Sequence, residues 1–288
     1  MDLVTISDLD SIEGCLRLID ERGDPPDFLI GEEIEARLPG SPLRVHLTVW
    51  GISPAQHKEI HRLTASVEEV AAFLRAEQIA SCFSHFVGSL PVDLPSAATY
   101  WRILSLFDAL EVRNGGQGRQ YNALTAELAV GEAERRGPVA FVGGSDAHTL
   151  RRVGTTWTEA AARSREEFLE AIRRGETEAG GRIRNRPDIV KDITELTLSH
   201  YAAVREGLRG GGGRWAKAPM LQAAAGVPLQ VLGAPLIGTA IYFWRVRSQV
   251  RALRREIASL DLRDFRERMS AFPRGAGLAP PPSSGRSA

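Results

Sequence analysis

The chain has 288 residues, of which 43% are hydrophobic and 25% are charged, a composition typical of a globular protein with a sizeable core. With 36 basic and 36 acidic residues its formal net charge is zero, so charge gives no indication of nucleic acid as a partner. Two cysteines are too few for a disulfide framework, and no signal segment is visible at the start, so we expect a cytoplasmic protein.

The first part of the chain predicts alternating strands and helices. Strands are expected at residues 3–7, 28–36 and 43–52, with helices at 12–21 and from 53 through 77, where Ser-Pro is a standard helix start. The second strand carries Glu32, Glu33 and Glu35, whose carboxylates need a metal, a cation or strong hydrogen bonds if they are buried. A solvated edge strand is the alternative, and both interpretations stay open.

Three histidines fall in this part of the chain. His46 lies within an apolar strand and is either an ordinary strand residue or a ligand. His57 and His61 are four apart on one helix face, a spacing that can bind a metal. The sequence His-Lys-Glu-Ile-His lacks the glutamate that directly follows the first histidine in zinc protease helices. We therefore expect His57 and His61 to be surface residues.

The middle of the chain continues the alternation, with strands expected at 79–85, 109–115 and 139–148 and helices at 97–107 and 120–136. This order predicts a mostly parallel α/β fold. In α/β barrels, ligands gather at the carboxyl ends of the strands. The polar residues at these predicted ends are His85, Glu111, Asn114, Asp146 and His148.

Asp146 and His148 follow a short apolar strand and two glycines. Residues two apart in an extended segment point the same way, so a carboxylate and an imidazole leave the strand side by side. That arrangement suits a metal-ligand pair. The alternative is a helix-capping aspartate followed by a surface histidine. The other polar strand ends favour the metal site.

The rest of the chain divides by composition. A strand at 153–159, a helix from 164 to 174 and a strand at 176–180 complete a first domain, residues 1–181. Residues 182–216 are expected to be a linker with a helical segment and a Gly-rich joint. An apolar and Arg-rich helical segment follows at 217–270, and a disordered tail at 271–288.

Residues 218–244 contain no charged side chain, and a bilayer core needs only about 20 apolar residues. An aromatic end followed by arginines is typical of a cytoplasmic membrane boundary, which would attach the protein to the inner face of the membrane. Three prolines and two glutamines within the stretch disfavour a lone lipid-facing helix. The alternative is a helical hairpin packed on the first domain or on a second subunit. The oligomeric state is left open.

Five short stretches carry a family resemblance. They are Val4-Thr-Ile-Ser-Asp-Leu-Asp-Ser-Ile-Glu-Gly14, Ile30-Gly-Glu-Glu33, Val45-His46, Ser84-His85 and Gly144-Ser-Asp-Ala-His148. In this order and spacing they resemble motifs of the PHP (polymerase and histidinol phosphatase) family of metal-dependent phosphoesterases, and most of all its stand-alone TrpH-type members. The resemblance spans residues 1 to about 181.

The resemblance implies a distorted (β/α)7 barrel that holds one to three divalent ions, such as zinc, manganese or iron. Carried over by position, Glu33, His46 and His85 would hold one metal, Asp146 would share a second with Glu33, and His148 would belong to a third. We expect these five residues to converge on one pocket, with Glu111 and Asn114 available to substrate.

Two departures from the family pattern bear on activity. The opening motif, which supplies two histidines, is absent from the printed sequence, and we expect it upstream of a late start or lost by truncation. Leu9 also stands where the second motif has a metal-binding histidine. Two hypotheses follow. The protein is a metal-dependent phosphoesterase acting on a phosphorylated small molecule, a nucleotide or an oligonucleotide, or it is a catalytically inactive scaffold or membrane-associated binding protein.

Overall fold

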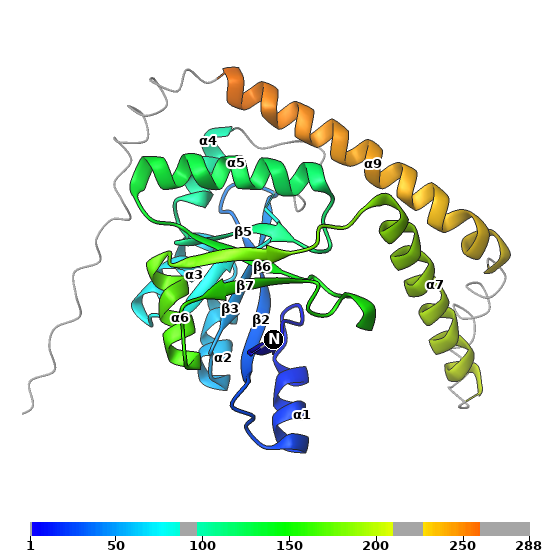
Figure 1. Ribbon diagram of the computed structural model, residues 1–288, viewed down its shortest axis with the longest axis horizontal. Helices are drawn as coiled ribbons and strands as arrows, with labels where there is room; N and C mark the ends of the chain where they lie inside the picture. The colour runs from blue at the N-terminus through cyan, green and yellow to red at the C-terminus, as the bar shows by residue number, and fades with distance from the viewer. Residues whose placement is uncertain (1, 87–96, 210–226, 260–288) are drawn as a thin grey trace, which may run out of the picture.

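The computed structural model describes residues 2–86, 97–209 and 227–259 (Figure 1). The strands are β1 (Val4–Ile6), β2 (Phe28–Arg37), β3 (Arg44–Trp50), β4 (Ala80–Phe83), β5 (Ala109–Asn114), β6 (Ala140–Gly144), β7 (Thr156–Ala160) and β8 (Thr177–Gly181). The helices are α1 (Glu13–Arg22), α2 (Pro54–Leu63), α3 (Val67–Ala76), α4 (Ala97–Leu104), α5 (Arg119–Arg136), α6 (Arg165–Arg174), α7 (Arg186–Arg209) and α9 (Val227–Ser259), with a 3-10 turn, η1, at Leu150–Arg152.

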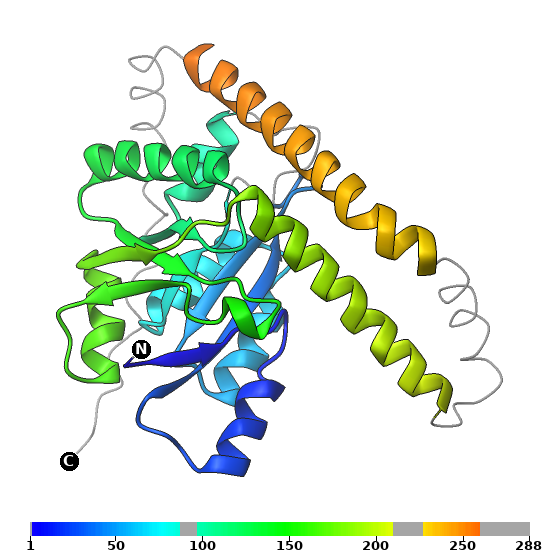
Figure 2. The same ribbon diagram turned by 45° about the vertical axis from the view of Figure 1, so that its right-hand side comes forward.

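The main sheet has the order β1-β2-β3-β4-β5-β6, and it curls so that the fold is a mixed α/β half-barrel with helices around it (Figure 2). The expectation of a mostly parallel sheet holds for β1–β2, β4–β5 and β5–β6 but is wrong for β2–β3 and β3–β4, which are antiparallel. The reason at β2–β3 is the connection. Only residues 38–43 join these strands, whereas a parallel pair needs a crossover of a dozen or more residues.

The hairpin of β7 and β8 forms its own two-stranded sheet, which packs beside β6 without joining the main sheet. Two threonines make the connection through their side chains. The hydroxyl of Thr158 donates to the carbonyl of Gly143 at 2.9 Å, and the hydroxyl of Thr177 donates to the carbonyl of Phe141 at 3.0 Å. The hairpin is therefore held to the last strand of the sheet.

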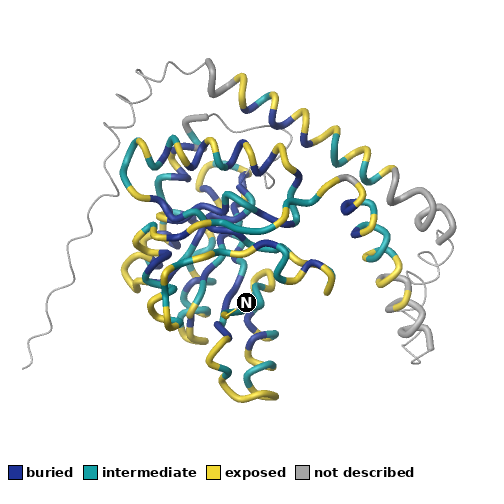
Figure 3. The backbone as a smooth tube through the Cα atoms, viewed as in Figure 1, coloured by how far each residue is buried: buried dark blue, intermediate teal, exposed yellow. Residues whose placement is uncertain are grey.

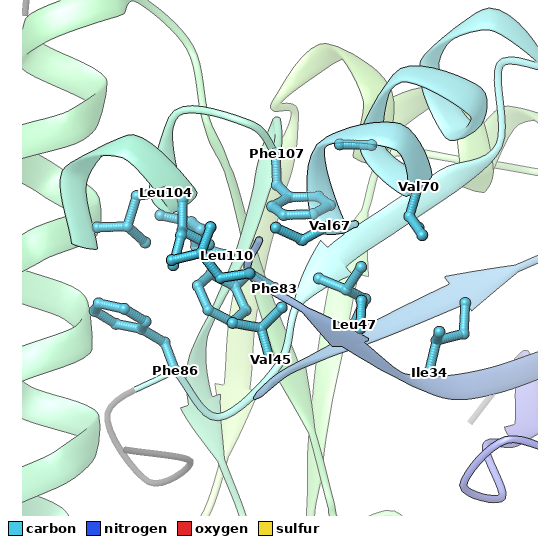
Figure 4. Close-up of a cluster of buried hydrophobic side chains, with 14 of the residues drawn as sticks. Ile34, Val45, Leu47, Val67, Val70, Phe83, Phe86, Leu104, Phe107 and Leu110 are labelled. Atoms are coloured by element: carbon cyan, nitrogen blue, oxygen red, sulfur yellow. The ribbon is translucent and has the colours of Figure 1, made fainter. Parts of the chain in front are cut away.

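The core lies between the sheet and the helices that cover it, as the buried positions in Figure 3 show. Strand residues such as Ile34, Leu47 and Leu110 are fully buried, and Val70 and Phe107 meet them in Figure 4. In β3 and the later part of β2, buried residues alternate with less buried ones, as the alternation of side chains in strands predicts.

The single helix expected from residue 53 through 77 is in fact two helices. The predicted start is confirmed, because the hydroxyl of Ser53 accepts from the backbone of Gln56 and the Gln56 side chain returns the bond, forming a capping box. α2 ends at Leu63, and Ser66 caps α3 by accepting from the backbone of Glu69. A second serine cap thus divides the segment and lets α3 turn its own apolar face towards the sheet.

The C-terminal helices α7 and α9 lie side by side, and α9 continues across α5 (Figures 1 and 2). Val246, Val250 and Leu253 of α9 are buried in the main core cluster. The hydroxyl of Tyr242 accepts from the backbone of Gly118, the residue before α5, at 2.6 Å. Packing on the first domain, one of the two expectations for this segment, is therefore observed for this part of α9.

The candidate membrane segment, residues 218–244, is described only from Val227 onwards. Among the helices of the described ranges, none is both long and apolar enough to cross a membrane. The Gly-rich joint expected at 210–213 and the tail expected at 271–288 lie outside the described residues.

A buried ion-pair network anchors α7 to the turn after β6. The guanidinium of Arg152 donates to both carboxylate oxygens of Asp192, at 2.8 and 3.0 Å to Oδ2, and both side chains are almost fully buried. Arg184 and Arg151 reach the same carboxylate at 3.3 and 2.6 Å. Burial would raise the pKa of Asp192, but the hydrogen bonds and charges of Arg152 and Arg184 outweigh it and lower that pKa.

Candidate metal centre

Glu33, His46 and His85 meet at one point of the curled sheet. His46 on β3 lies opposite Glu35 in the β2–β3 register, so its ring shares a face with Glu35 and Glu33. His46 Nδ1 is 2.5 Å from Glu33 Oε1, and His85 Nε2 is 2.8 Å from the same oxygen. The ligand atoms of these three residues all lie within 4.8 Å of one another. We call them the Glu33 cluster.

The cluster is electrostatically coupled. Burial would raise the pKa of Glu33, but hydrogen bonds and charges from His46 and His85 outweigh it and lower that pKa to about 2. Burial would lower the pKa of His85, but its hydrogen bond to Glu33, with the charges of Glu111, Glu33 and Asp146, raises it to about 9. Glu33 and His85 thus stabilise each other's charged forms.

Leu9 lies directly beside this cluster. It bridges to Glu33 as a parallel β-partner, with the Asp10 N–H donating to the Glu33 carbonyl at 2.7 Å and the Glu33 N–H donating to the Asp8 carbonyl at 3.1 Å. The leucine is 54% exposed. The leucine side chain therefore lies beside the Glu33 cluster, at the position where the second motif of the PHP family has a histidine.

Asp146 and His148 follow β6, which ends at Gly144. Asp146 has a positive φ of 45°, and His85 one of 27°, in the left-handed region that non-glycine residues rarely adopt. Gly116 lies so close to the Asp146 carboxylate that a Cβ there would collide with it. Backbone strain at these two strand ends is typical of a site that holds side chains in a set position.

The five predicted ligands are brought together only in part. Glu33, His46 and His85 meet, and the charge of Asp146 raises the pKa of His85. The His148 side chain is 70% exposed, and its Nδ1 lies 3.2 Å from the Asp146 carbonyl and 3.5 Å from its carboxylate. A metal role for Asp146 and His148 stays a prediction.

Glu111 and Asn114, expected near substrate, are buried within the protein. The Glu111 carboxylate accepts from the backbone N–H of His85 at 2.7 Å and from the Asn114 side chain at 2.9 Å. Burial raises the pKa of Glu111 to about 7, although the charge of His85 and these hydrogen bonds oppose it. These contacts favour a supporting role for Glu111 in setting the position of His85, and contact with substrate stays a prediction.

The donor set of the Glu33 cluster fits a divalent transition metal. Two imidazoles and one carboxylate, with an open fourth position, are the three-ligand pattern of many zinc sites. The His46 and His85 side chains are partly exposed, so an ion and a substrate can reach them from solvent. The structure thus supplies ligands for one metal at this cluster.

The expectation that His57 and His61 are ordinary surface residues is wrong. His57 Nδ1 lies 2.9 Å from Glu32 Oε2, and His61 Nε2 lies 2.6 Å from Glu32 Oε1. Glu32 itself is completely buried. The signal in the sequence was the pair Glu32-Glu33, because adjacent residues of a strand face opposite ways and one of the two carboxylates had to point towards the helices.

Residues 127–177, which include Asp146 and His148, match the family model described as PHP-associated. A crystal structure from Bifidobacterium adolescentis, of a protein provisionally assigned as a metal-dependent phosphoesterase, is similar over 52% of this chain and 78% of its own, with 16% sequence identity and a TM-score of 0.32. A likeness at that TM-score carries no argument about function. No protein of curated function matches the chain.

Proposed function

We propose that this chain, whose residues 127–177 match a PHP-associated family model, is a metal-dependent phosphoesterase that hydrolyses a phosphate ester of a small molecule, a nucleotide or an oligonucleotide. The observation that carries the proposal is the convergence of Glu33, His46 and His85 on one point. We further propose that the curled sheet belongs to a (β/α)7 barrel comprising residues 1–181.

In this proposal Glu33, His46 and His85 hold one divalent ion, with Asp146 sharing a second with Glu33 and His148 serving a third. A bound ion of this kind polarises a phosphoryl oxygen and acidifies water. Glu33 supplies a carboxylate that stays ionised at neutral pH, since its pKa is about 2. Glu111, buried and bonded to the His85 backbone, keeps that histidine in its strained conformation.

The exposed Leu9 beside Glu33 favours a second candidate function. With a leucine in place of this histidine, the third metal would keep only His148 of the residues assigned to it, fewer than the three protein ligands that catalytic zinc sites normally use. The protein would then be a catalytically inactive PHP-like scaffold or a binding protein, either free or associated with a membrane.

Two measurements separate these functions. The zinc, manganese and iron content of the full chain is measured by elemental analysis, and hydrolysis of bis(p-nitrophenyl) phosphate and p-nitrophenyl phosphate is followed with added manganese. Turnover that a chelator abolishes and manganese restores supports the phosphoesterase. Bound metal at the Glu33 cluster without turnover of either ester favours the scaffold.

A further inference from the structure

The face of β2 that packs on the helices carries one carboxylate. Glu32, Ile34 and Ala36 alternate along the strand, share this face and are fully buried. The two apolar residues belong to the main core cluster. Glu32 therefore places an acidic group at the border of an otherwise apolar core, on the opposite side of the strand from Glu33.

α2 covers this carboxylate with two histidines. His57 and His61 are one helical turn apart, so they lie on the same face of α2, and Ile60 between them is buried in the core. Their ring centroids are 4.5 Å apart. The ligand atoms of Glu32, His57 and His61 all lie within 4.8 Å of one another. We call these three residues the Glu32 cluster.

A fully buried carboxylate needs a compensating charge or a full set of hydrogen bonds. Two neutral imidazoles can each donate one N–H, but they bring no positive charge. A divalent ion would supply that charge and would use the ring nitrogens as acceptors. His57 and His61 are 23% and 28% exposed at their side chains, so an ion can enter from solvent and keep a water as its fourth ligand.

We propose that Glu32, His57 and His61 form a second metal site, for zinc, that ties α2 to β2 and is separate from the phosphoesterase centre. Nitrogen and oxygen ligands of a tetrahedral zinc lie about 3.3 Å apart. The nitrogen-to-oxygen distances in the Glu32 cluster are 2.6 to 3.0 Å. Zinc therefore enters when the two histidine rings move outwards by a few tenths of an ångström, which their partial exposure permits.

The chemistry of the site indicates a structural role. Two of the ligands belong to α2, the third belongs to β2 and none belongs to the Glu33 cluster, so the ion would join a helix to the sheet. Two imidazoles with one carboxylate are typical zinc ligands. The proposal does not depend on phosphoesterase activity, and its failure would leave the proposed function intact.

The test uses the full chain with Glu33→Gln, which removes the shared carboxylate of the other cluster. We compare it with Glu33→Gln/His61→Gln and, as a matched control on the same helix, with Glu33→Gln/Lys58→Gln, which changes an exposed residue next to His57. Each protein is loaded with zinc, desalted and analysed for metal per chain. The same proteins are loaded with cobalt for absorption spectra and melted with and without zinc.

The expected result is one zinc per chain in Glu33→Gln and in the Lys58 control, a tetrahedral cobalt spectrum, and a rise in Tm of roughly 5 °C or more at a hundredfold excess of zinc over Kd. His61→Gln in the same background is expected to lose the zinc, the spectrum and the shift. Equal zinc with and without His61, or no zinc in Glu33→Gln, would overturn the proposal. If the His61 variant fails to fold, His57→Gln replaces it, and an absent tetrahedral cobalt spectrum in Glu33→Gln is sufficient to reject the site.

Discussion

The Glu33 and Glu32 clusters each combine one glutamate with two histidines whose ligand atoms lie within 4.8 Å of one another, yet the two glutamates stand on opposite faces of one strand. The Glu33 cluster gathers its histidines from a neighbouring strand and a strand end, lies beside strained backbone at His85, and is near Asp146. The Glu32 cluster takes both histidines from one helix and sits against the core. Ligand chemistry alone therefore does not define a catalytic site, because the residues around the ligands decide whether a bound ion can contact a substrate.

The largest contrast is expected in activity. Glu33→Gln should lower the hydrolysis of bis(p-nitrophenyl) phosphate by about 100-fold or more, because it removes the shared ligand of the catalytic ions. Glu32→Gln should leave turnover per folded molecule within about threefold, since it touches neither His46 nor His85. Rates at saturating manganese check this. Equal losses of activity in the two variants would contradict separate roles and would show that both clusters serve catalysis.

Asp192, a buried carboxylate paired with arginines and not with histidines, provides a comparison for the zinc dependence of the Glu32 cluster. Asp192→Asn should lower the free energy of unfolding by about 3 kcal/mol, because it removes the closest carboxylate partner of the buried Arg152 and leaves only Asp188, at 3.5 Å. Zinc should not change that loss, whereas the loss caused by Glu32→Gln should be larger in zinc than in chelator. Urea unfolding in zinc and in chelator measures both. A zinc-dependent loss in Asp192→Asn would contradict this distinction.

The pH dependence of the Asp192 effect has a defined sign. The pKa of Asp192 is lowered in the folded protein, so its stabilisation is complete above the ordinary carboxyl pKa of about 3.9. The stabilisation is lost as the pH falls through the lowered folded-state value. The difference in stability between the unmodified chain and Asp192→Asn should therefore be constant from pH 6 to 7 and should shrink in acid below about pH 4.

A substitution expected to raise activity tests the role of the exposed Leu9 beside the Glu33 cluster. Leu9→His should raise hydrolysis by about tenfold or more, because an imidazole beside Glu33 adds a ligand where a leucine now stands. Zinc at the Glu32 cluster should be unchanged. Leu9→Gln, which is polar but has no imidazole, is the matched control. An equal gain in both variants would show that removal of the apolar side chain, and not metal binding, is responsible.

The smallest effect is expected at His148. Because this side chain is largely exposed and its described contacts are to Asp146, His148→Ala should change the zinc content and the stability of both clusters by less than about twofold. Elemental analysis and thermal melts are sufficient. Loss of one further metal per chain would support the proposed third ion at His148, whereas loss of the metal of either cluster would contradict this expectation.

Much of this arrangement could be predicted from sequence. Helix caps such as Ser53 and Ser164, and the alternation of apolar residues in β2 and β3, depend on local chemistry, and they lie where the sequence predicts them. The meeting of Glu33, His46 and His85 was implied by the family resemblance. No local spacing brings residues from three separate segments to one point.

The missed features depend on contacts between distant segments. The helix containing His57 and His61 showed only an i, i+4 pair, and its partner Glu32 lies in another element 25 residues earlier. The antiparallel direction of β4 is likewise set by tertiary contacts. Local sequence patterns carry little information about such pairings, because burial of a polar group is decided by whichever element covers it.

The pairing of β2 with β3 has a consequence for how each glutamate is assigned to its histidines. A slip of β2 by one residue would turn Glu32 towards His46 and Glu33 towards α2, since neighbouring side chains face opposite ways. Such a slip would also expel Ile34 and Ala36 from the core. The burial of Ile34 and Ala36 therefore fixes the register of this strand, and with it which glutamate faces the partly exposed His46 and His85 and which one lies beneath α2.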